Sequence, residues 1–404
     1  MKVVVTGNTA ISLVNLRGPL LAAFVNAGHE VIACAPDKDE EAIAPLREIG
    51  VSYRSVDLDR TGINPLKDLH FLNDLTRFLR DVHPDIVLNY TIKPVIFGTW
   101  AARRAGVPAR FSMMTGLGWA FGEHTFKQRV INALVRQLYR WSLPQNKAVF
   151  FQNSDDLDLF VRSGLVSDPQ RAVLINGSGV DLNYFSEVPP YTRRPVFLLI
   201  GRLLKEKGIV EYVEAARTLK GKYPQAAFQL LGAFDSNPSC ISRTQLEDWQ
   251  QEGIIEYLGT VEDVRPFIAN SSVYVLPSYR EGTSRATLEA MAMGRPIVTT
   301  NVPGCRQTVV DGKNGFLITS SDVMTLAKAM ERFISRPDLI VSMGKLSRKI
   351  AVEKYDVQEV NTTIMKTMGL LNDEVSTEVA QRLQNSSGCA CTSLPVPIQN
   401  IDSG

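Results

Sequence analysis

The segments Met1-Lys-Val-Val-Val-Thr-Gly7 and His29-Glu-Val-Ile-Ala-Cys-Ala35 decide the fold class. Each contains a short run of apolar residues, as the buried strands of parallel sheets do. The apolar stretch Leu20–Ala27 between them, closed by Gly28, predicts a helix. A strand, a helix and a second strand in this order indicate a parallel sheet with helices packed on it.

The same alternation continues through the first half of the chain and, after an interruption, through the second. Proline and polar residues make the segment 188–195 the linker candidate. Before it we predict strands at Asp85–Asn89, Ala109–Met113, Ala148–Gln152 and Ala172–Ile175, and helices at Leu66–Val82 and Ile96–Ala105. After it we predict strands at Val196–Ile200, Ala227–Leu231, Ile255–Leu258, Val273–Leu276 and Pro296–Thr299, and helices at Val210–Tyr223, Val264–Asn270 and Ser284–Met293.

We therefore expect an α/β protein with two Rossmann-like, doubly wound domains that face each other across a cleft. The first domain is expected at 1–187 and the second at 196–350, followed by helices at 351–375 that can cross back to the first domain. Residues 376–404 are rich in Ser, Asn, Gln and Pro, and we expect them to form a disordered tail. The role of Cys389 and Cys391 in this tail stays open.

Composition excludes several classes of protein. Of the 404 residues, 45% are hydrophobic and 21% are charged, which is typical of a soluble globular protein. The net charge of +2 gives no indication of nucleic-acid binding. The five cysteines lack the spacing of a zinc site and suit a reducing cytoplasm. The N-terminus does not resemble a signal peptide, and no apolar run reaches the roughly 18 residues that a membrane span needs.

Two glutamates mark the predicted functional site. Glu281 follows the predicted strand Val273–Leu276, and Glu289 lies about two turns further on, in the next predicted helix. In open α/β sheets, ligands bind at the carboxyl ends of the strands. An ionised carboxylate there accepts several strong hydrogen bonds, as sugar hydroxyls require. Two glutamates at this spacing also occur by chance, so the interpretation depends on their neighbours.

Those neighbours lie in the segment Gly201-Arg-Leu-Leu-Lys-Glu-Lys-Gly208, between the predicted strand Val196–Ile200 and a helix. Gly201 lets a ligand approach the backbone closely. Arg202 and Lys207 place two positive charges beside a helix N-terminus, which favours a phosphate site, although a solvated basic turn is the plainer interpretation. Combined with the two glutamates, the segment suits a nucleotide-sugar, with the diphosphate near the cations and the sugar near the carboxylates.

Three ordered motifs resemble those of the GT-B retaining glycosyltransferases of family 4. They are the segments 201–208, 277–298 and Asp311-Gly-Lys-Asn-Gly-Phe-Leu317, and the resemblance runs from Met1 to about Leu370. It implies a hexosyltransferase without a cofactor, in which Arg202 and Lys207 hold the donor diphosphate. It further implies that Glu289 holds the nucleotide ribose and that Glu281 contacts the transferred sugar. Backbone amides would face the phosphates from Gly282, Thr283, Ser284 and Arg285.

A narrower resemblance is to bacterial transferases that act on undecaprenyl-diphospho-linked sugars. It rests on Ser12-Leu-Val-Asn-Leu-Arg-Gly-Pro19 in the expected first loop, on Gly116-Leu-Gly118 and on Gly232-Ala-Phe-Asp-Ser-Asn-Pro-Ser239. It implies a UDP-sugar donor and a polyprenyl-diphospho-saccharide acceptor in cell-surface glycan synthesis. The implied acceptor-binding residues are Arg17, for a phosphate, with Ser12, Asn15 and Gly116. An ordinary surface arginine is the alternative for Arg17.

A lipid-linked acceptor requires contact with a membrane surface. From Ile86 to Lys147 there are nine Lys or Arg residues and one acidic residue. Within this region, Phe126–Leu143 places Val130, Ile131, Leu134, Leu138 and Trp141 on one face of a predicted helix. A basic amphipathic helix favours binding to an anionic membrane surface, here the inner face of the cell membrane. The alternative is a helix that packs its apolar face into the core.

Other interpretations remain open at this stage. Asp57-Leu-Asp59 resembles a metal-binding DxD motif but lies in the first domain, so we expect no metal site. Many family 4 enzymes carry a histidine near the reacting sugar, and His124 is displaced from that position. A UDP-N-acetylhexosamine epimerase of the same architecture is the main alternative function. A dinucleotide-binding reductase lacks its GxGxxG motif here, and a sugar-binding protein without activity leaves the diphosphate site unexplained.

Overall fold

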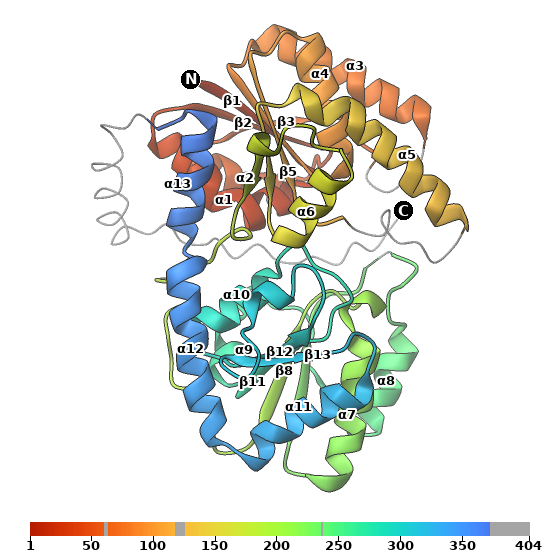
Figure 1. Ribbon diagram of the computed structural model, residues 1–404, viewed down its shortest axis with the longest axis vertical. Coiled ribbons are helices and arrows are strands. Elements are labelled where there is room, and N and C mark those ends of the chain that lie inside the picture. The colour runs from red at the N-terminus through yellow and green to blue at the C-terminus, as the bar shows by residue number, and fades with distance from the viewer. Residues whose placement is uncertain (60–63, 118–125, 236, 372–404) are drawn as a thin grey trace. The chain divides into compact units, whose positions relative to one another are not determined.

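The computed structural model describes residues 1–59, 64–117, 126–235 and 237–371 (Figure 1). The chain forms two compact units, each built on its own parallel sheet. Unit 1 comprises Met1–Ser178 and the segment that begins at Val357, and unit 2 comprises Gly179–Asp356. The predicted α/β class, with two doubly wound sheets, is therefore confirmed.

The sheet of unit 1 has seven strands within the described residues, in the order β3-β2-β1-β4-β5-β6-β7. The order changes direction between β1 and β4, where residues Thr6 and Asn89 are register partners at the carboxyl ends of the strands. The elements of this unit are β1 (Lys2–Thr6), α1 (Ala10–Asn26), β2 (Glu30–Ala35), α2 (Glu40–Glu48), β3 (Ser52–Ser55), α3 (Pro65–Val82), β4 (Ile86–Tyr90), η1 (Pro94–Gly98), α4 (Thr99–Arg104), β5 (Ala109–Met114), α5 (Phe126–Ser142), η3 (Leu143–Gln145), β6 (Ala148–Phe151), α6 (Ser154–Arg162), η4 (Pro169–Arg171), β7 (Ala172–Leu174) and α13 (Val357–Met368).

Helix α1 corrects one prediction. It begins at Ala10, with the Thr9 hydroxyl accepting from the Ser12 amide at 3.1 Å, whereas the sequence pattern predicts a loop up to Leu20. Gly18 and Pro19 indicate a break, and an interior proline costs about 3 kcal/mol. The helix also buries three leucines, each of which contributes about 1.5–3 kcal/mol, and this offsets the cost of the proline (Leu13, Leu20 and Leu21).

The sheet of unit 2 has six strands in the part of the chain that the structure describes, in the order β10-β9-β8-β11-β12-β13. Strand β8 therefore lies directly beside β11, with Tyr274 opposite Leu198. The elements are β8 (Val196–Ile200), η5 (Lys205–Lys207), α7 (Ile209–Lys222), β9 (Ala227–Leu231), α8 (Arg243–Gln251), β10 (Glu256–Tyr257), α9 (Arg265–Ala269), β11 (Val273–Leu276), α10 (Arg285–Ala292), β12 (Ile297–Thr300), η6 (Arg306–Thr308), β13 (Gly315–Ile318), α11 (Val323–Ser335) and α12 (Asp338–Lys354).

The predicted linker 188–195 belongs to unit 2, so the division of the chain falls at Ser178 and Gly179 rather than after residue 187. The reason is a fully buried guanidinium. Arg295 donates to the carbonyl oxygens of Val188 at 3.0 Å, Ile268 at 2.8 Å and Ala269 at 3.1 Å. Arg348 acts in the same way on the preceding turn, donating to the carbonyl oxygen of Phe185 at 3.2 Å.

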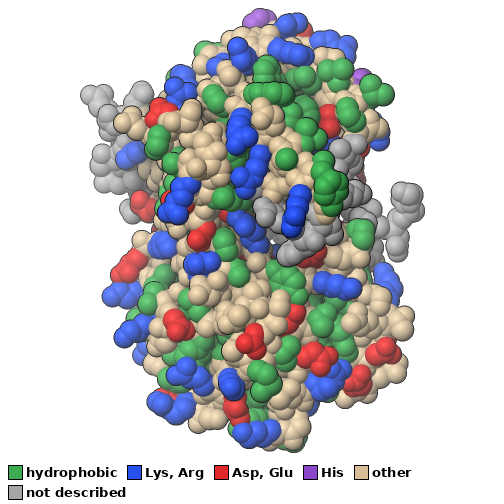
Figure 2. Space-filling view, turned by 45° about the vertical axis from the view of Figure 1, so that its right-hand side comes forward, with side chains coloured by type: hydrophobic (Ala, Val, Ile, Leu, Met, Phe, Trp, Pro, Cys, Tyr) green, Lys and Arg blue, Asp and Glu red, His purple; other side chains and the backbone are tan. Residues whose placement is uncertain are grey.

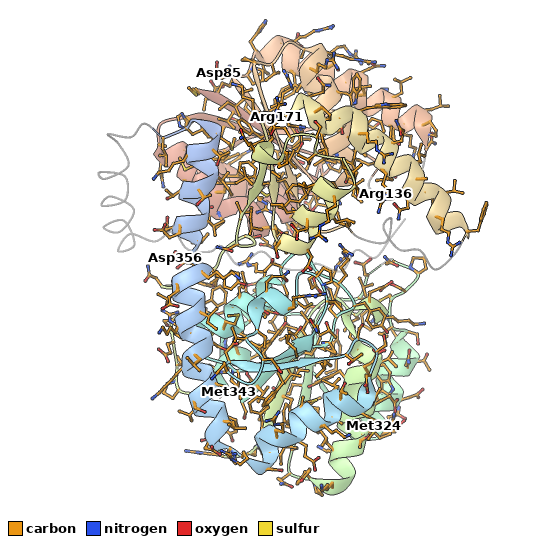
Figure 3. The ribbon with its side chains drawn as sticks, in the orientation of Figure 1. Asp85, Arg136, Arg171, Met324, Met343 and Asp356 are labelled. Carbon is orange, nitrogen blue, oxygen red and sulfur yellow. The ribbon has the colours of Figure 1, made fainter. Side chains whose placement is uncertain are left out.

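The chain returns to unit 1 after α12. Helix α12 packs in unit 2, where Ile340 and Met343 join its core. Asp356, labelled in Figure 3, ends this unit, and α13 then buries Val360 and Ile364 in the core beneath the first sheet. The end of unit 1 thus comes from residues that follow unit 2 in the sequence.

Replacing Arg295 with lysine tests the role of the buried guanidinium. An ammonium group lacks the fork that reaches several carbonyl groups at once, and unsatisfied buried carbonyls destabilise a fold. We expect Arg295→Lys to lower the free energy of unfolding by about 2–4 kcal/mol in urea titrations. Arg336→Lys, at an exposed Arg–Asp pair, is the control. Equal losses in the two variants would contradict this role for Arg295.

Candidate active site

The candidate site lies at the carboxyl ends of two neighbouring strands of unit 2. The segment after β8 carries Arg202 and Lys207, and the segment after β11 carries Glu281. Because β8 and β11 are adjacent and parallel, both segments leave the same edge of the sheet. The sequence prediction that strand-end residues from separate motifs converge follows from this topology.

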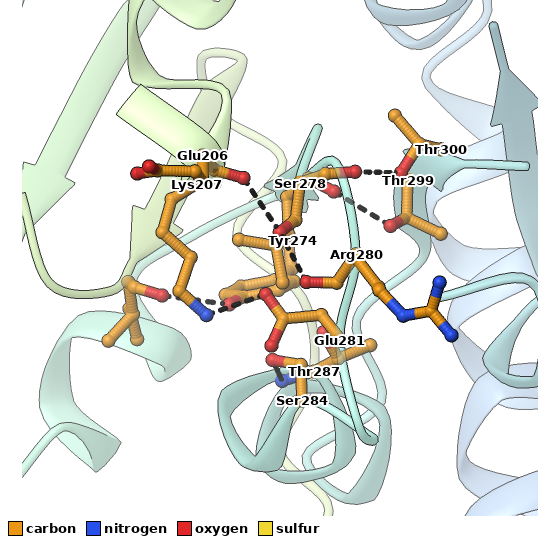
Figure 4. A network of polar contacts seen from close by, with 12 residues as sticks. Glu206, Lys207, Tyr274, Ser278, Arg280, Glu281, Ser284, Thr287, Thr299 and Thr300 are labelled. Atoms are coloured by element: carbon orange, nitrogen blue, oxygen red, sulfur yellow. Dashed lines mark hydrogen bonds and ion pairs between the residues drawn. The ribbon is translucent and has the colours of Figure 1, made fainter. Parts of the chain in front are cut away.

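Lys207 and Glu281 form an ion pair. The ammonium Nζ of Lys207 donates to Oε1 of Glu281 at 2.6 Å, and the side chains are only 22% and 11% exposed. Figure 4 shows the two side chains pointing toward each other from different loops. A charge-assisted hydrogen bond at this degree of burial is stronger than an exposed pair and fixes both groups.

Hydroxyl groups hold the two loops together. Ser278 donates to the carbonyl oxygen of Glu206 at 3.0 Å, which ties the β11 loop to the β8 loop. Thr299 donates to the carbonyl oxygen of Leu276 at 2.7 Å, and Thr300 donates to that of Ser278 (Figure 4). The position of Glu281 therefore depends on contacts from three strands.

One glycine is required for this close approach of the loops. Gly208 has φ +73°, in the left-handed region, and a Cβ there would lie 2.1 Å from the carbonyl oxygen of Pro277. Gly201 differs, because a Cβ there would meet nothing closer than Lys207 at 3.8 Å. The protein's own packing therefore does not require a glycine at position 201.

Glu289 lies on α10, where it is buried beside Arg285. Nε of Arg285 lies 2.7 Å from Oε1 of Glu289. Burial raises the pKa of the Glu289 carboxyl, although the Arg285 guanidinium acts to lower it. Burial also raises the pKa of the Tyr274 phenol, and the negative charges of Glu281 and Glu289 raise it further. Both predicted glutamates thus lie near one tyrosine of β11.

Tyr274 joins these groups to the end of β8, because its hydroxyl donates to the carbonyl oxygen of Ile200 at 3.1 Å. The adjacent loop residues Gly282 and Thr283 lead into α10, and Ser284 caps the helix by accepting from the Thr287 amide at 3.3 Å. The sequence pattern did not single out Tyr274. Its only signal is its place in the strand that immediately precedes the Glu281 loop.

Arg202 is held by a carboxylate that the sequence analysis did not assign. Nη1 of Arg202 donates to Oδ2 of Asp235 at 2.7 Å, with the arginine 62% and the aspartate 21% exposed. Asp235 follows β9 and belongs to the segment 232–239, one of the three segments that resemble transferases acting on undecaprenyl-diphospho-linked sugars. Each of the two predicted phosphate-binding cations is therefore paired with a carboxylate.

The predicted acceptor-binding residues lie in unit 1. Ser12, Asn15 and Arg17 are on α1 rather than in a loop, and Gly116 follows β5 with φ +120°. Ser12 and Arg17 both contact Tyr90, through a hydroxyl–hydroxyl distance of 2.7 Å and through a guanidinium 5.4 Å from the ring centre. No such contact links Gly116 to them among the interactions of the described residues.

Residues considered for other chemistry lie elsewhere. Asp59 pairs with Lys67 at 3.8 Å, and Asp57 lies 3.7 Å from His70, all in unit 1. In the described ranges, no group of three or more His, Cys, Asp or Glu side chains is placed to hold a metal ion. His124, Gly118 and the cysteines Cys389 and Cys391 lie outside the described residues.

Two family models match the chain, one in each unit. Residues 18–177 match the glycosyl transferase 4-like domain, and residues 194–336 match glycosyl transferases group 1. The chain therefore belongs to the GT-B glycosyltransferases, and the predicted enzyme class is confirmed. Both descriptions name glycosyl transfer, so the epimerase alternative is not supported.

Two relatives with named reactions and one solved structure are similar to the chain over most of its length. The chain is 26% identical over 371 residues to an N,N'-diacetylbacillosaminyl-diphospho-undecaprenol alpha-1,3-N-acetylgalactosaminyltransferase of Campylobacter jejuni, covering 88% of this chain and 95% of that protein. It is 26% identical over 308 residues to a UDP-Gal:alpha-D-GlcNAc-diphosphoundecaprenol alpha-1,3-galactosyltransferase of Escherichia coli, covering 73% and 78%. The HepE structure from Anabaena, in complex with UDP and glucose, has a TM-score of 0.74 at 17% identity, covering 92% and 100%, and supports the fold.

Replacing Asp235 with asparagine tests how far this carboxylate controls Arg202. Asparagine keeps the oxygen that accepts from the Asn237 amide at 2.9 Å but removes the negative charge beside the guanidinium. We expect Asp235→Asn to bind UDP about two- to fivefold more tightly in calorimetric titrations, since an exposed pair contributes up to about 1 kcal/mol. Asp338→Asn removes the aspartate of the exposed pair on α12 and is the control. Weaker UDP binding in Asp235→Asn would show that the pair organises the site instead.

Proposed function

We propose that the protein transfers a hexose or N-acetylhexosamine from a UDP-sugar to a polyprenyl-diphosphate-linked saccharide, with retention of the anomeric configuration. The observation that carries the proposal is the Lys207–Glu281 pair at the adjoining ends of β8 and β11. The ammonium group lies 2.6 Å from the carboxylate. This supports a site in which Lys207 meets a leaving diphosphate and Glu281 accepts from sugar hydroxyls. Family membership supports the reaction class.

The roles of the donor-side residues follow from their charges. Arg202 and Lys207 stabilise the negative charge that develops on the departing UDP. Glu281 holds and orients the transferred sugar, and buried Glu289 accepts from the ribose hydroxyls. Gly201 leaves room for the diphosphate, and the amides of Gly282, Thr283, Ser284 and Arg285 contribute donors beside it. Positioning and leaving-group stabilisation supply most of the rate in this scheme.

The names of the relatives support the acceptor class. The Campylobacter and Escherichia proteins are both named for sugars carried on an undecaprenyl diphosphate, and the Escherichia protein is named for a UDP-galactose donor. On this basis we assign Ser12, Asn15, Arg17 and Gly116 to the acceptor side, in unit 1.

Helix α5 supports contact with an anionic membrane surface. Four apolar side chains of the helix are each more than half exposed (Phe126, Val130, Leu134 and Trp141). Asn132 and Tyr139 are buried on the opposite face, with Tyr139 packed edge-on against Phe160 at 5.4 Å. Of the predicted apolar face, Val130, Leu134 and Trp141 are exposed, whereas Ile131 and Leu138 are half-buried and Leu138 packs against the core of unit 1. The exposed part of the face supports the membrane contact.

Basic residues accompany this exposed face. Arg129 and Arg140 are exposed, while Arg136, labelled in Figure 3, donates to Asn132 at 2.8 Å. Figure 2 shows Lys and Arg side chains beside apolar ones over unit 1, with fewer acidic ones than over unit 2. None of the helices among the described residues is long and apolar enough to cross a bilayer. The helix is therefore proposed to lie on the inner face of the cell membrane.

Donor turnover with and without acceptor tests the reaction. We expect UDP release from a panel of UDP-sugars only when membrane-extracted polyprenyl-diphospho-saccharide is present. Glu289→Ala should weaken UDP binding roughly tenfold or more, because it removes a buried acceptor of charged hydrogen bonds. Glu281→Ala should mainly lower kcat. Conversion of a UDP-sugar to its epimer without acceptor would overturn the function, and full activity of both variants would overturn the site.

Serine substitutions on α5 test membrane contact. Trp141→Ser combined with Phe126→Ser should reduce binding to vesicles of equal parts phosphatidylglycerol and phosphatidylcholine at least about tenfold, since each aromatic contributes about 1.5–3 kcal/mol when buried. Met324→Ser, at an equally exposed apolar position on α11, is the control. Vesicle sedimentation measures the effect. Unchanged binding of the double variant would exclude α5 as the contact.

A further inference from the structure

Arg17 has an unusual environment for a charged side chain. It is only 2% exposed, and burial lowers the pKa of its guanidinium to about 10, which still leaves it charged at neutral pH. Nη1 donates to the Ser178 hydroxyl at 3.4 Å, a long hydrogen bond. Nε and Nη2 have no hydrogen-bond partner among the described residues, and no carboxylate there forms an ion pair with Arg17.

An arrangement of this kind reduces the stability of the folded chain. A buried charge without a partner is costly, and replacing buried ionic groups with apolar ones of similar size is often neutral or stabilising. The stacking of Arg17 on the Tyr90 ring, at 5.4 Å, offsets part of this cost. Fold stability therefore does not explain why a guanidinium occupies this position.

The two unpartnered nitrogens indicate what the group binds. Nε and Nη2 lie on one edge of the guanidinium, and that edge can donate two parallel hydrogen bonds to two oxygens of a phosphate or carboxylate. Arg295 donates to backbone carbonyl groups, whereas Arg17 makes no such hydrogen bond among the described residues. The free edge thus has the geometry of an anion receptor.

The side chains around Arg17 are polar and neutral. The Ser178 hydroxyl also accepts from Nε2 of Gln152 at 3.3 Å, and the Tyr90 hydroxyl lies 2.7 Å from that of Ser12. These residues come from the ends of β4 and β6, from α1 and from the turn after β7, so they gather at the carboxyl edge of the sheet. The first amides of α1 are already bonded, to Asp37 and Thr9.

We propose that Arg17, with Ser12, Tyr90, Gln152 and Ser178, forms a receptor for a phosphoryl group of the lipid-linked diphosphate acceptor. The proposal rests on the function proposed above and assigns the phosphate contact of the acceptor. Ser178 accepts from Nη1 and lies between Gly177 and Gly179, which have φ +63° and +70°.

Geranyl diphosphate, a short isoprenyl diphosphate, is the probe for the receptor. Its binding is measured by calorimetry with UDP at saturating concentration, so that the donor site is occupied. We expect Arg17→Met to weaken geranyl diphosphate binding at least tenfold, to leave the affinity for UDP unchanged, and to unfold at the same temperature as the wild type or a higher one. Unchanged geranyl diphosphate binding would overturn the proposal, and so would a loss confined to UDP, which would assign Arg17 to the donor.

Two further variants separate binding from folding. Arg110→Met removes another guanidinium of unit 1, which donates to the Gln145 carbonyl oxygen at 2.8 Å. This variant should unfold more easily than the wild type but bind geranyl diphosphate equally well. Arg17→Lys keeps the charge but loses the two-nitrogen edge, so its binding should also weaken. If Arg17→Met is less stable than Arg110→Met, or Arg17→Lys binds like the wild type, the receptor assignment is wrong.

Failure of this proposal differs from failure of the proposed function. Geranyl diphosphate binding is measured without turnover, so it does not depend on which sugar the enzyme moves. If the wild type transfers sugar to the lipid acceptor and Arg17→Met does so with an unchanged KM for that acceptor, only the receptor is wrong. If the wild type binds geranyl diphosphate but never releases UDP in response to a lipid-linked saccharide, the function is wrong and the receptor remains.

Discussion

The parallel pairing of β8 with β11 is the constraint on which the candidate site depends. It brings two segments more than 70 residues apart in the chain to one edge of the sheet, where Lys207 meets Glu281. Three further features of the proposed donor site accompany this contact. Ser278 ties the two loops, Gly208 permits their approach, and Tyr274 extends from the same strand toward both glutamates.

The cations assigned to the proposed donor site are paired with carboxylates. Lys207 is paired with Glu281, Arg202 with Asp235 and Arg285 with Glu289, so each cation has a carboxylate within ion-pair distance. Such pairing keeps cations in place in a partly buried site, where uncompensated charge would destabilise the fold. A ligand that carries both negative charge and hydroxyl groups can satisfy the cations and the carboxylates together. A simple anion satisfies only the cations, which favours a nucleotide-sugar over phosphate alone.

Much of the fold and of the site's position is predictable from the sequence, because hydrophobic runs indicate strands and glycines often mark their ends. The α/β class, the second-domain strands and the placement of Glu281 and Glu289 all follow from such local patterns. The prediction starts helix α1 too late, at Leu20, because Gly18 and Pro19 indicate a break. The burial of Leu13, Leu20 and Leu21, which stabilises the longer helix, is a tertiary effect. The linker was misplaced, because the carbonyl groups that Arg295 binds lie far from it in sequence. Asp235 lies in a segment quoted for the resemblance and Tyr274 in the strand before the Glu281 loop, but no local pattern predicts their side-chain contacts.

The junction between the units has a mechanical consequence. In the described chain, the backbone passes between them at Ser178–Gly179 and again at Asp356–Val357. These two passages are joined side by side in a short bridge, in which the Val180 amide donates to the Tyr355 carbonyl at 2.8 Å. If the backbone were cut at either connection, the other connection would still join the two units.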